Sequence, residues 1–323
     1  MNKGFWEKLD KPIFALAPMA NVTDAAFRRI IAKYGKPDVM WTEFVSADGL
    51  ALAPEEGRRK LMLDLKYGET ERPIVAQFFT SNPEHMRQAA QLATSLGFDG
   101  VDINMGCPDK SVEKQGAGAN LMKNPERARE LIRAAKEGAP NLPISVKTRI
   151  GYSRPDLENW LPEILKEEPA AVIIHARTRK EMSKVLARWE FVKEAVAIRN
   201  KLGSQTLILG NGDVANLTEA RQRVEETGCD GVMLGRAIFG NPWLFKEEIP
   251  ATEEKLKVLI EHCRLFEELL GQDKSFAIMK KHFKAYVNGF DGAADLRNSL
   301  MASRNAREAE EIIVSFIDIM RHI

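Results

Sequence analysis

Gly100-Val-Asp-Ile-Asn-Met-Gly-Cys-Pro108 passes from an apolar strand directly into a tight turn that carries a lone cysteine. Gly106 lets the backbone fold sharply and Pro108 restricts the exit, so Cys107 is expected at the mouth of whatever the strand leads into. Most free cysteines are small, buried and inert. A position just past a strand end usually faces solvent or ligand, which favours a functional role for Cys107.

The same pattern, an apolar strand, a polar or glycine-containing turn and an amphipathic helix, recurs along the chain. Continuous apolar runs such as Val172-Ile-Ile174 are typical of parallel strands buried on both faces. Asn82-Pro83 and Asn124-Pro125 each place a capping residue before a helix-starting proline. The expected strands are Ile13 to Ala17, Asp38 to Glu43, Ile74 to Phe79, Gly100 to Met105, Ile144 to Arg149, Ala171 to His175, Leu207 to Gly210 and Gly231 to Leu234. The expected helices between them include Asp24 to Lys33, Pro83 to Leu96, Pro125 to Lys136, Trp160 to Lys166, Trp189 to Leu202 and Leu217 to Thr227.

Strand and helix alternating in this way predict an α/β fold, a (β/α)8 TIM barrel. An open doubly wound sheet usually has fewer strands and a glycine fingerprint after the first one, whereas here the first strand ends in Ala17-Pro18-Met19. Beyond Pro250 the pattern becomes helical, with a first helix opened by Thr252 and ended by Gly271. We therefore expect a barrel domain over residues 1–249 and a small all-helical domain over residues 250–323.

Composition limits the classes of function. The 323 residues suit one large barrel with a small appendage, and a net charge of +1 means that a nucleic-acid partner must be met by a local basic patch. Cys107, Cys229 and Cys263 are far apart and show no CxxC spacing, which predicts a reduced, cytoplasmic protein without a metal site. The N-terminal residues have no apolar core of signal-peptide length, and no window approaches a membrane span.

In a barrel of this kind the C-terminal strand ends form one ring, where active sites of the fold lie. Polar groups converge there, although each costs desolvation unless it is paired. Lys147 emerges from the apolar run Ile144-Ser-Val146 and needs an anionic partner such as a reduced flavin, whereas His175 alone suits a hydrogen-bonded core histidine. The ring is expected to hold Pro18, Met19, Glu43, Gln77, Asn104, Cys107, Lys147, Arg149, His175, Arg177, Asn211, Gly212, Asp213, Gly235 and Arg236.

Two of the loops on this ring suggest a phosphate site. Leu209-Gly-Asn-Gly-Asp213 and Leu234-Gly-Arg-Ala237 are paired glycine turns that open onto backbone amides, where this fold commonly holds a phosphate. Either loop alone is read more simply as a tight turn. Both together, with Arg236 beside them, favour the phosphate.

Six motifs in one order make the chain resemble the tRNA-dihydrouridine synthase family, FMN-dependent enzymes with a barrel and a C-terminal helical domain. None of the motifs is very specific alone, and the resemblance rests on their joint occurrence. They are Ala17-Pro-Met-Ala-Asn-Val-Thr-Asp24, Asp102-Ile-Asn-Met-Gly-Cys-Pro108, Gly116-Ala-Gly-Ala119, Ser145-Val-Lys-Thr-Arg149, Asn211-Gly-Asp213 and Gly235-Arg236.

The resemblance implies a reaction in which NADPH reduces FMN, the flavin delivers hydride to C6 of uracil in tRNA, and Cys107 protonates C5. A thiol near its usual pKa of about 8.5 is still protonated at neutral pH, as a general acid must be. The implied cofactor contacts are Ala17, Pro18, Met19, Gln77, Lys147, His175, Asn211, Gly212, Asp213, Gly235 and Arg236. The implied substrate side comprises Asn104, Arg149 and Arg177, together with Lys280, Lys281, Lys284 and Arg297 of the helical domain.

One loop departs from the family pattern. After His175 the family commonly continues Arg-Thr-Arg-x-Gln-x-Tyr-x-Gly-x-Ala-Asp-Trp, whereas Glu181, Ser183, Val185 and Arg188 here replace Gln, Tyr, Gly and an acid. Arg177, Thr178 and Trp189 keep the frame, so the loop bears on which RNA position is modified and leaves the fold unaffected.

Two other functions stay open at this stage. One is an FMN-dependent barrel reductase of a small molecule, like a dihydroorotate dehydrogenase, although such a substrate needs no helical platform. The other is an RNA-binding protein without chemistry, against which the set Cys107, Lys147 and His175 argues. The lysine face of the helical domain is equally well read as a solvated surface, and no obligate protein partner is evident.

Overall fold

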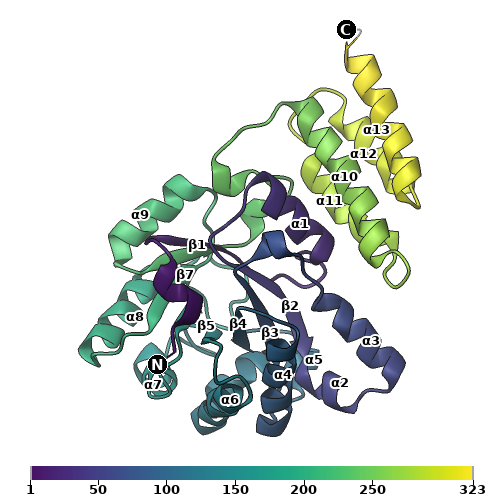
Figure 1. Cartoon of the computed structure of the whole chain (residues 1–323). Helices are drawn as coiled ribbons and strands as arrows, with labels where there is room; N and C mark the ends of the chain where they lie inside the picture. Colours follow the sequence, from purple (N-terminus) through teal and green to yellow (C-terminus); the bar gives the residue numbers. More distant parts are fainter. Residues whose placement is uncertain (1, 322–323) are drawn as a thin grey trace.

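A computed structural model describes residues 2–321 of the chain, and Met1, His322 and Ile323 of the two expected domains lie outside it. Eight parallel strands form one sheet in the order β1-β8-β7-β6-β5-β4-β3-β2, with helices outside it (Figure 1). This confirms the predicted TIM barrel. The strands are β1 (Ile13–Leu16), β2 (Met40–Ser46), β3 (Ile74–Phe79), β4 (Gly100–Met105), β5 (Ile144–Arg149), β6 (Ala171–His175), β7 (Leu207–Asn211) and β8 (Gly231–Leu234).

The two ends of the sheet meet through the chain just ahead of β2. Ala15 of β1 forms an isolated parallel bridge with Val39. Around it, the Leu16 amide donates to the Val39 carbonyl at 3.1 Å, and the Asp38 amide donates to the Phe14 carbonyl at 2.9 Å. Asp38 and Val39 are therefore used for closure, and the regular strand begins at Met40 and runs on to Ser46, later than the sequence predicts.

The expected helices are present, with ends that their capping residues set. The Asn82 side chain accepts from the Glu84 and His85 amides, and the Asn124 side chain accepts from the Arg127 amide. The helix expected from Trp160 starts earlier, at Leu157. The outer layer comprises α1 (Ala25–Tyr34), α4 (Pro83–Ser95), α6 (Pro125–Gly138), α7 (Leu157–Leu165), α8 (Glu190–Lys201) and α9 (Leu217–Thr227), with α2 (Ala47–Leu52), α3 (Glu55–Asp64) and α5 (Lys110–Glu113) as additions.

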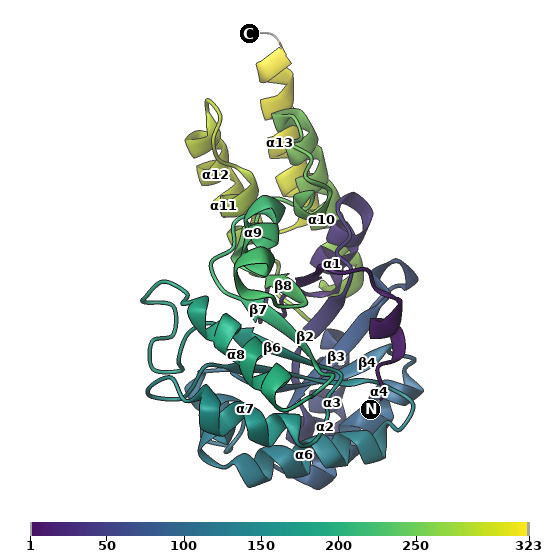
Figure 2. The same cartoon turned by 90° about the vertical axis from the view of Figure 1, so that its left-hand side faces the viewer.

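The C-terminal helices lie together beside α1, away from the bottom of the barrel (Figures 1 and 2). Phe27 of α1 stacks on His262 at 5.0 Å and meets the edge of His282 at 4.8 Å between ring centroids. One hydrophobic core runs from the outer layer of the barrel into these helices, and the division at residue 250 stays a prediction. The helices are α10 (Thr252–Leu270), α11 (Met279–Tyr286), α12 (Ala293–Ala302) and α13 (Ala306–Arg321). Within residues 2–321, every helix is too short or too polar to span a bilayer.

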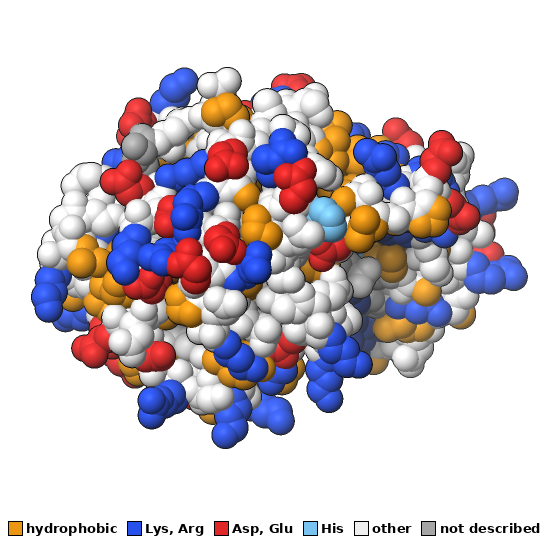
Figure 3. Space-filling model, turned by 90° about the horizontal axis from the view of Figure 1, so that it is seen from below, with side chains coloured by type: hydrophobic (Ala, Val, Ile, Leu, Met, Phe, Trp, Pro, Cys, Tyr) orange, Lys and Arg blue, Asp and Glu red, His pale blue; other side chains and the backbone are white. Residues whose placement is uncertain are grey.

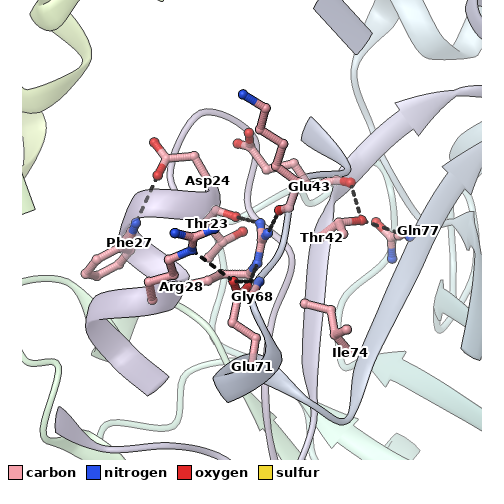
Figure 4. A network of polar contacts seen from close by, with 12 residues as sticks. Thr23, Asp24, Phe27, Arg28, Thr42, Glu43, Gly68, Glu71, Ile74 and Gln77 are labelled. Carbon is pink, nitrogen blue, oxygen red and sulfur yellow. Dashed lines mark hydrogen bonds and ion pairs between the residues drawn. The ribbon is translucent and has the colours of Figure 1, made fainter. Parts of the chain in front are cut away.

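A fully buried ion pair ties α1 to the loop before β3 (Figure 4). Arg28 donates from Nε to Glu71 at 2.6 Å, from Nη1 to the Thr23 carbonyl at 2.7 Å and from Nη2 to the Lys66 carbonyl. Glu71 also accepts from the Gly68 amide at 2.7 Å. Both side chains have 0% exposure, so the pair holds only because these hydrogen bonds offset the desolvation of two charges.

Replacing Arg28 by Met leaves Glu71 charged and buried without its guanidinium. We expect the free energy of unfolding to fall by about 3–5 kcal/mol, the usual cost of breaking a buried pair from one side. Urea unfolding followed by far-UV circular dichroism measures it. Lys60→Ala, which removes the exposed pair with Glu56, is the matched control and should leave the midpoint unchanged. Equal midpoints for the two variants would contradict this account of Arg28.

Candidate active site

A cavity of about 270 Å³ opens at the C-terminal ends of the strands. Every barrel residue that the sequence assigned to cofactor or substrate lies in its wall, so the structure brings that set together while their roles stay predictions. They are Ala17, Pro18, Met19, Gln77, Asn104, Cys107, Lys147, Arg149, His175, Arg177, Asn211, Gly212, Asp213, Gly235 and Arg236. The wall also contains Phe44, Thr148, Ser183, Val214 and Met233, which sequence reasoning did not single out as site residues.

Glu43, which the sequence placed on the ring, does not line the cavity. The pairing of β2 with β3 shifts register between Trp41 and Phe44, and this irregularity places Phe44 in the cavity wall in place of Glu43. Glu43 instead accepts from the Val22 amide at 3.2 Å and pairs with Lys274 at 3.3 Å. Burial raises the pKa of Glu43 to about 7, although Lys274 opposes the shift.

The Cys107 turn is held from several sides. The Asn104 side-chain oxygen accepts from the Gly106 amide at 3.1 Å and from the Cys107 amide at 2.9 Å. A Cβ at Gly118, where φ is +60°, would lie 2.8 Å from the Cys107 carbonyl, so this close approach requires glycine. Burial raises the pKa of the Cys107 thiol, and the backbone at Asp109 opposes the shift. The thiol is therefore protonated at neutral pH and suits a proton donor.

Lys147 is the cation of the cavity. Its Nζ donates to the Asn211 side-chain oxygen at 3.2 Å, the one hydrogen bond that the described residues give it. Burial, followed by the charge of Arg149, lowers the pKa of Lys147 to about 8, while Asp102 acts in the opposite direction. A Lys ammonium has three hydrogens, so Lys147 keeps donors for a ligand. An anion bound beside it would raise its pKa again.

Arg149, expected on the substrate side, donates hydrogen bonds to backbone carbonyls of the protein. Its Nε donates to the Gly106 carbonyl at 2.8 Å, and its Nη1 donates to the Thr178 and Met182 carbonyls at 3.2 Å. The guanidinium therefore joins the Cys107 turn to the loop after β6. Arg149 still lines the cavity and contributes positive charge to its wall.

Arg177 connects the loop after β6 to His175 and Asp213 in the cavity wall. It donates to the Val185 carbonyl at 2.7 Å, pairs with Asp213 and approaches His175 Nε2 at 3.1 Å. A guanidinium has no acceptor, so Nε2 must accept and the proton of neutral His175 sits on Nδ1. Burial, with the charges of Arg149 and Lys147, lowers the pKa of His175 well below its ordinary value and keeps the ring neutral. His175 thus presents a fixed N–H donor.

The two glycine turns frame the remaining side. The Trp189 indole donates to the Gly212 carbonyl at 2.9 Å, and the same ring fills the space where a Cβ on Gly210 would stand. Asp213 is bracketed by Arg177 and Arg236, and Arg236 is 64% exposed at the cavity mouth. The acid is thus neutralised twice, which leaves this corner able to accept an anion.

The atypical loop after β6 carries its own ion pairs. Both Glu181 carboxylate oxygens accept from Arg188 at 2.7 Å, and Glu181 also accepts from the Thr178 amide at 2.8 Å. Arg179 pairs with Glu113 of α5, next to the Cys107 turn. The substitutions therefore form a salt-bridged loop, and Ser183 from it lines the cavity.

The basic residues of the helical region lie outside the cavity and divide into two groups. Lys281 donates to the Asn21 carbonyl in the β1–α1 loop, and Arg297 donates to the Val287 carbonyl at 2.7 Å. Both therefore have contacts within the chain. Lys284 is exposed and Lys280 is half-buried on the same helix, α11.

The three cysteines are all reduced and apart. Cys229 and Cys263 are buried, and Cys107 is half-buried at the cavity. Between residues 2 and 321, no three His, Cys, Asp or Glu side chains gather as a candidate metal site.

Fold and cavity together define a (β/α)8-barrel enzyme whose active-site mouth favours an anionic ligand. The chain matches the model of the dihydrouridine synthase family over residues 15–322. It is 39% identical over 320 residues to a probable tRNA-dihydrouridine synthase 2 of Bacillus subtilis (strain 168), which covers 98% of this chain and 97% of the relative. It belongs to the dihydrouridine synthase family, a family of oxidoreductases.

A second relative agrees with this assignment, and a solved structure shares the fold. A probable tRNA-dihydrouridine synthase of Staphylococcus epidermidis is 38% identical over 320 residues, covering 98% of this chain and 97% of the relative. A solved structure of an old yellow enzyme homologue from Zymomonas mobilis has a TM-score of 0.51 at 12% identity, covering 74% of this chain and 89% of that one. The latter likeness is one of fold alone.

Proposed function

We propose that this protein reduces uridine in tRNA to 5,6-dihydrouridine, with FMN as cofactor and NADPH as reductant. The observation that carries the proposal is one cavity that holds both a half-buried cation, Lys147, and a protonated thiol, Cys107. When bound, the flavin would supply hydride for C6 of the uracil. Because tRNA is the substrate, the cytoplasm is the expected site of action.

The donors of the cavity suit FMN. Lys147 and Gln77 each keep an N–H after their contacts within the protein, which matches the carbonyl edge of an isoalloxazine ring. Ala17, Met19 and Met233 give apolar surface for the ring. Arg236 and the glycine turns then provide charge and backbone amides for the phosphate.

Cys107 would donate the proton. Hydride addition at C6 places negative charge on the base, and a proton at C5 completes the reduction. A thiol with a raised pKa holds that proton until it is needed and gives it up to a carbanion-like centre. Asn104, which anchors the Cys107 amide, would lie against the same base.

Two alternatives are less well supported. A barrel reductase of a small molecule shares the cavity but has no use for the helical region with its exposed Lys284. A binding protein without chemistry has no use for Lys147, which is half-buried and poorly paired and therefore costs desolvation. The names of the relatives also favour tRNA.

The affinity for FMN should depend on the charge of Lys147. Its pKa in the free protein is about 8, and an anionic ligand raises it. FMN affinity is therefore expected to be flat between about pH 7, above the second pKa of a phosphate monoester, and about pH 8, and to fall at higher pH by up to about tenfold per pH unit until the pKa of the complex is reached. Titration of apoprotein with FMN, followed by flavin fluorescence, measures this. Lys147→Met should bind more weakly below pH 8 and lose the fall above it, whereas identical curves would remove Lys147 from the site.

Cys107→Ala should separate the two halves of the reaction. FMN content and flavin reduction by NADPH should stay at the wild-type level, because neither needs the thiol. Dihydrouridine formation should fall about 100-fold to 10,000-fold, the range for loss of a general acid. Single-turnover assays with reduced enzyme and unmodified tRNA measure the second step. Cys229→Ala, which alters a buried cysteine away from the cavity, is the control, and an active Cys107→Ala enzyme would exclude the proposed role.

Within residues 2–321, Lys280 and Lys284 are the α11 lysines that form no hydrogen bond or ion pair with the barrel, and we expect them to meet tRNA phosphates. Lys280→Ala/Lys284→Ala should reduce the slope of log affinity against log salt by somewhat less than two units and leave flavin reduction unchanged. Filter binding at several salt concentrations gives the slope.

The matched control for that slope removes two positive charges far from α11. Arg133→Ala/Lys166→Ala alters α6 and the end of α7, at the opposite side of the molecule in Figure 1. On the underside of the molecule, basic and acidic side chains are interspersed (Figure 3). The control should keep the wild-type slope, and equal slopes for both double variants would mean that the α11 lysines are only solvated.

A further inference from the structure

Asp102 is a buried carboxylate that the reaction proposed above does not use. It sits on β4 with 0% exposure and accepts from Ser145 Oγ of β5 at 2.5 Å and from Gln77 Nε2 of β3 at 2.6 Å. The three residues stand side by side in register, Gln77 beside Asp102 and Asp102 beside Ser145. Burial raises its pKa to about 6, and both hydrogen bonds oppose the rise.

From Asp102 a chain of hydrogen bonds runs to the proposed acid. Gln77 Nε2 donates to Asp102, Asn104 Nδ2 donates to Gln77 Oε1 at 3.0 Å, and Asn104 Oδ1 accepts from the Gly106 and Cys107 amides. Each amide side chain is therefore bonded at both ends. All members of the chain are buried or half-buried, so water does not readily replace a lost partner.

The direction of this chain is fixed from both ends. Backbone amides can only donate, so Asn104 must turn its oxygen to Cys107 and its NH2 group to Gln77. A carboxylate can only accept, so Gln77 must turn its NH2 group to Asp102 and its oxygen to Asn104. Both amides are then left with one further N–H, and both residues line the cavity.

We propose that Asp102 is a positioning residue that, together with the Gly106 and Cys107 amides at the other end of the chain, sets the polarity of Gln77 and Asn104, so that the cavity offers two N–H donors to carbonyl groups of its ligands. This rests on the proposed function for the identity of those ligands, the flavin ring at Gln77 and the uracil at Asn104. A base with an amino group in place of the carbonyl would face a donor and lose the bond. Asp102 therefore contributes to the selection of uracil without touching it.

A reversal of the chain tests the proposal. In Asn104→Asp, carboxylates stand on both sides of Gln77, and its oxygen faces one of them whichever way the amide turns. In Asp102→Asn/Asn104→Asp the order inverts: residue 102 donates to Gln77, Gln77 donates to residue 104, and Ser145 and both backbone amides keep acceptors. We expect Asn104→Asp to melt at least about 4 °C below the wild type and the double variant to recover most of that loss. A double variant no more stable than Asn104→Asp would contradict the proposed hydrogen-bond chain from Asp102 to Cys107.

Activity provides the second readout. Asparagine at 102 can donate or accept, so in Asp102→Asn the polarity of Gln77 is enforced only from the Asn104 end. Its kcat for uridine reduction should fall about 10-fold to 100-fold, the usual effect of losing an orienting partner. The KM for tRNA should stay unchanged, because the phosphates are held elsewhere. Ser145→Ala removes the other hydrogen bond to Asp102 and should keep kcat within about threefold.

The outcomes separate the two proposals. A wild-type kcat in Asp102→Asn, or an equal loss in Ser145→Ala, would mean that Asp102 only fills the core. The melting measurements use the protein as purified and need no tRNA, so their failure counts against the hydrogen-bond chain. Failure of the wild-type protein to reduce uridine counts against the proposed function instead.

Discussion

The pairing of β1 with the chain ahead of β2 turns a curved sheet into a closed barrel. Two backbone hydrogen bonds around the Ala15–Val39 bridge make this closure. Without it, Ala17, Pro18 and Met19 after β1 would not stand opposite Lys147 and Arg149 at the end of β5. The cavity therefore depends on a backbone contact, the Ala15–Val39 bridge, whose residues do not line the cavity.

Inside the closed ring, positive charge dominates. Lys147, Arg149, Arg177 and Arg236 face the cavity, and Asp213 compensates for only part of this charge. Their joint field helps to keep His175 neutral. Burial and this positive charge together lower the pKa of Lys147 and keep His175 neutral, and the same excess of positive charge favours the binding of an anion.

Much of the barrel follows from the sequence. The bounds of β3, β4, β5, β6 and β8 match the predicted strands, because each contains apolar residues that are followed by a polar or glycine-containing loop. The residues of the ring at the C-terminal strand ends were predicted from the barrel topology alone. The prediction that Glu43 lies on the ring was wrong, because the hydrophobic pattern of a sequence does not reveal an irregularity in strand register.

Other details depend on side-chain partners that lie far apart in the sequence. Arg149 and Arg177 bind loop carbonyls, and Lys281 reaches the Asn21 carbonyl of the β1–α1 loop. A sequence reveals that these residues are charged but not which neighbour satisfies them. The hydrogen-bond chain from Asp102 to Cys107 was hidden for the same reason, since it passes from β4 to Gln77 of β3 and back to β4.

The burial of Cys107 has a consequence for the durability of the protein. Only a thiolate reacts rapidly with peroxide or with a disulfide, and a raised pKa keeps its fraction at neutral pH very small. A cysteine that serves as an acid is thereby spared the oxidation that threatens cysteines serving as nucleophiles. Under the proposed function, the chain can keep the Cys107 sulfur at the cavity reduced through oxidative stress, although the other two cysteines are buried and do not line that cavity.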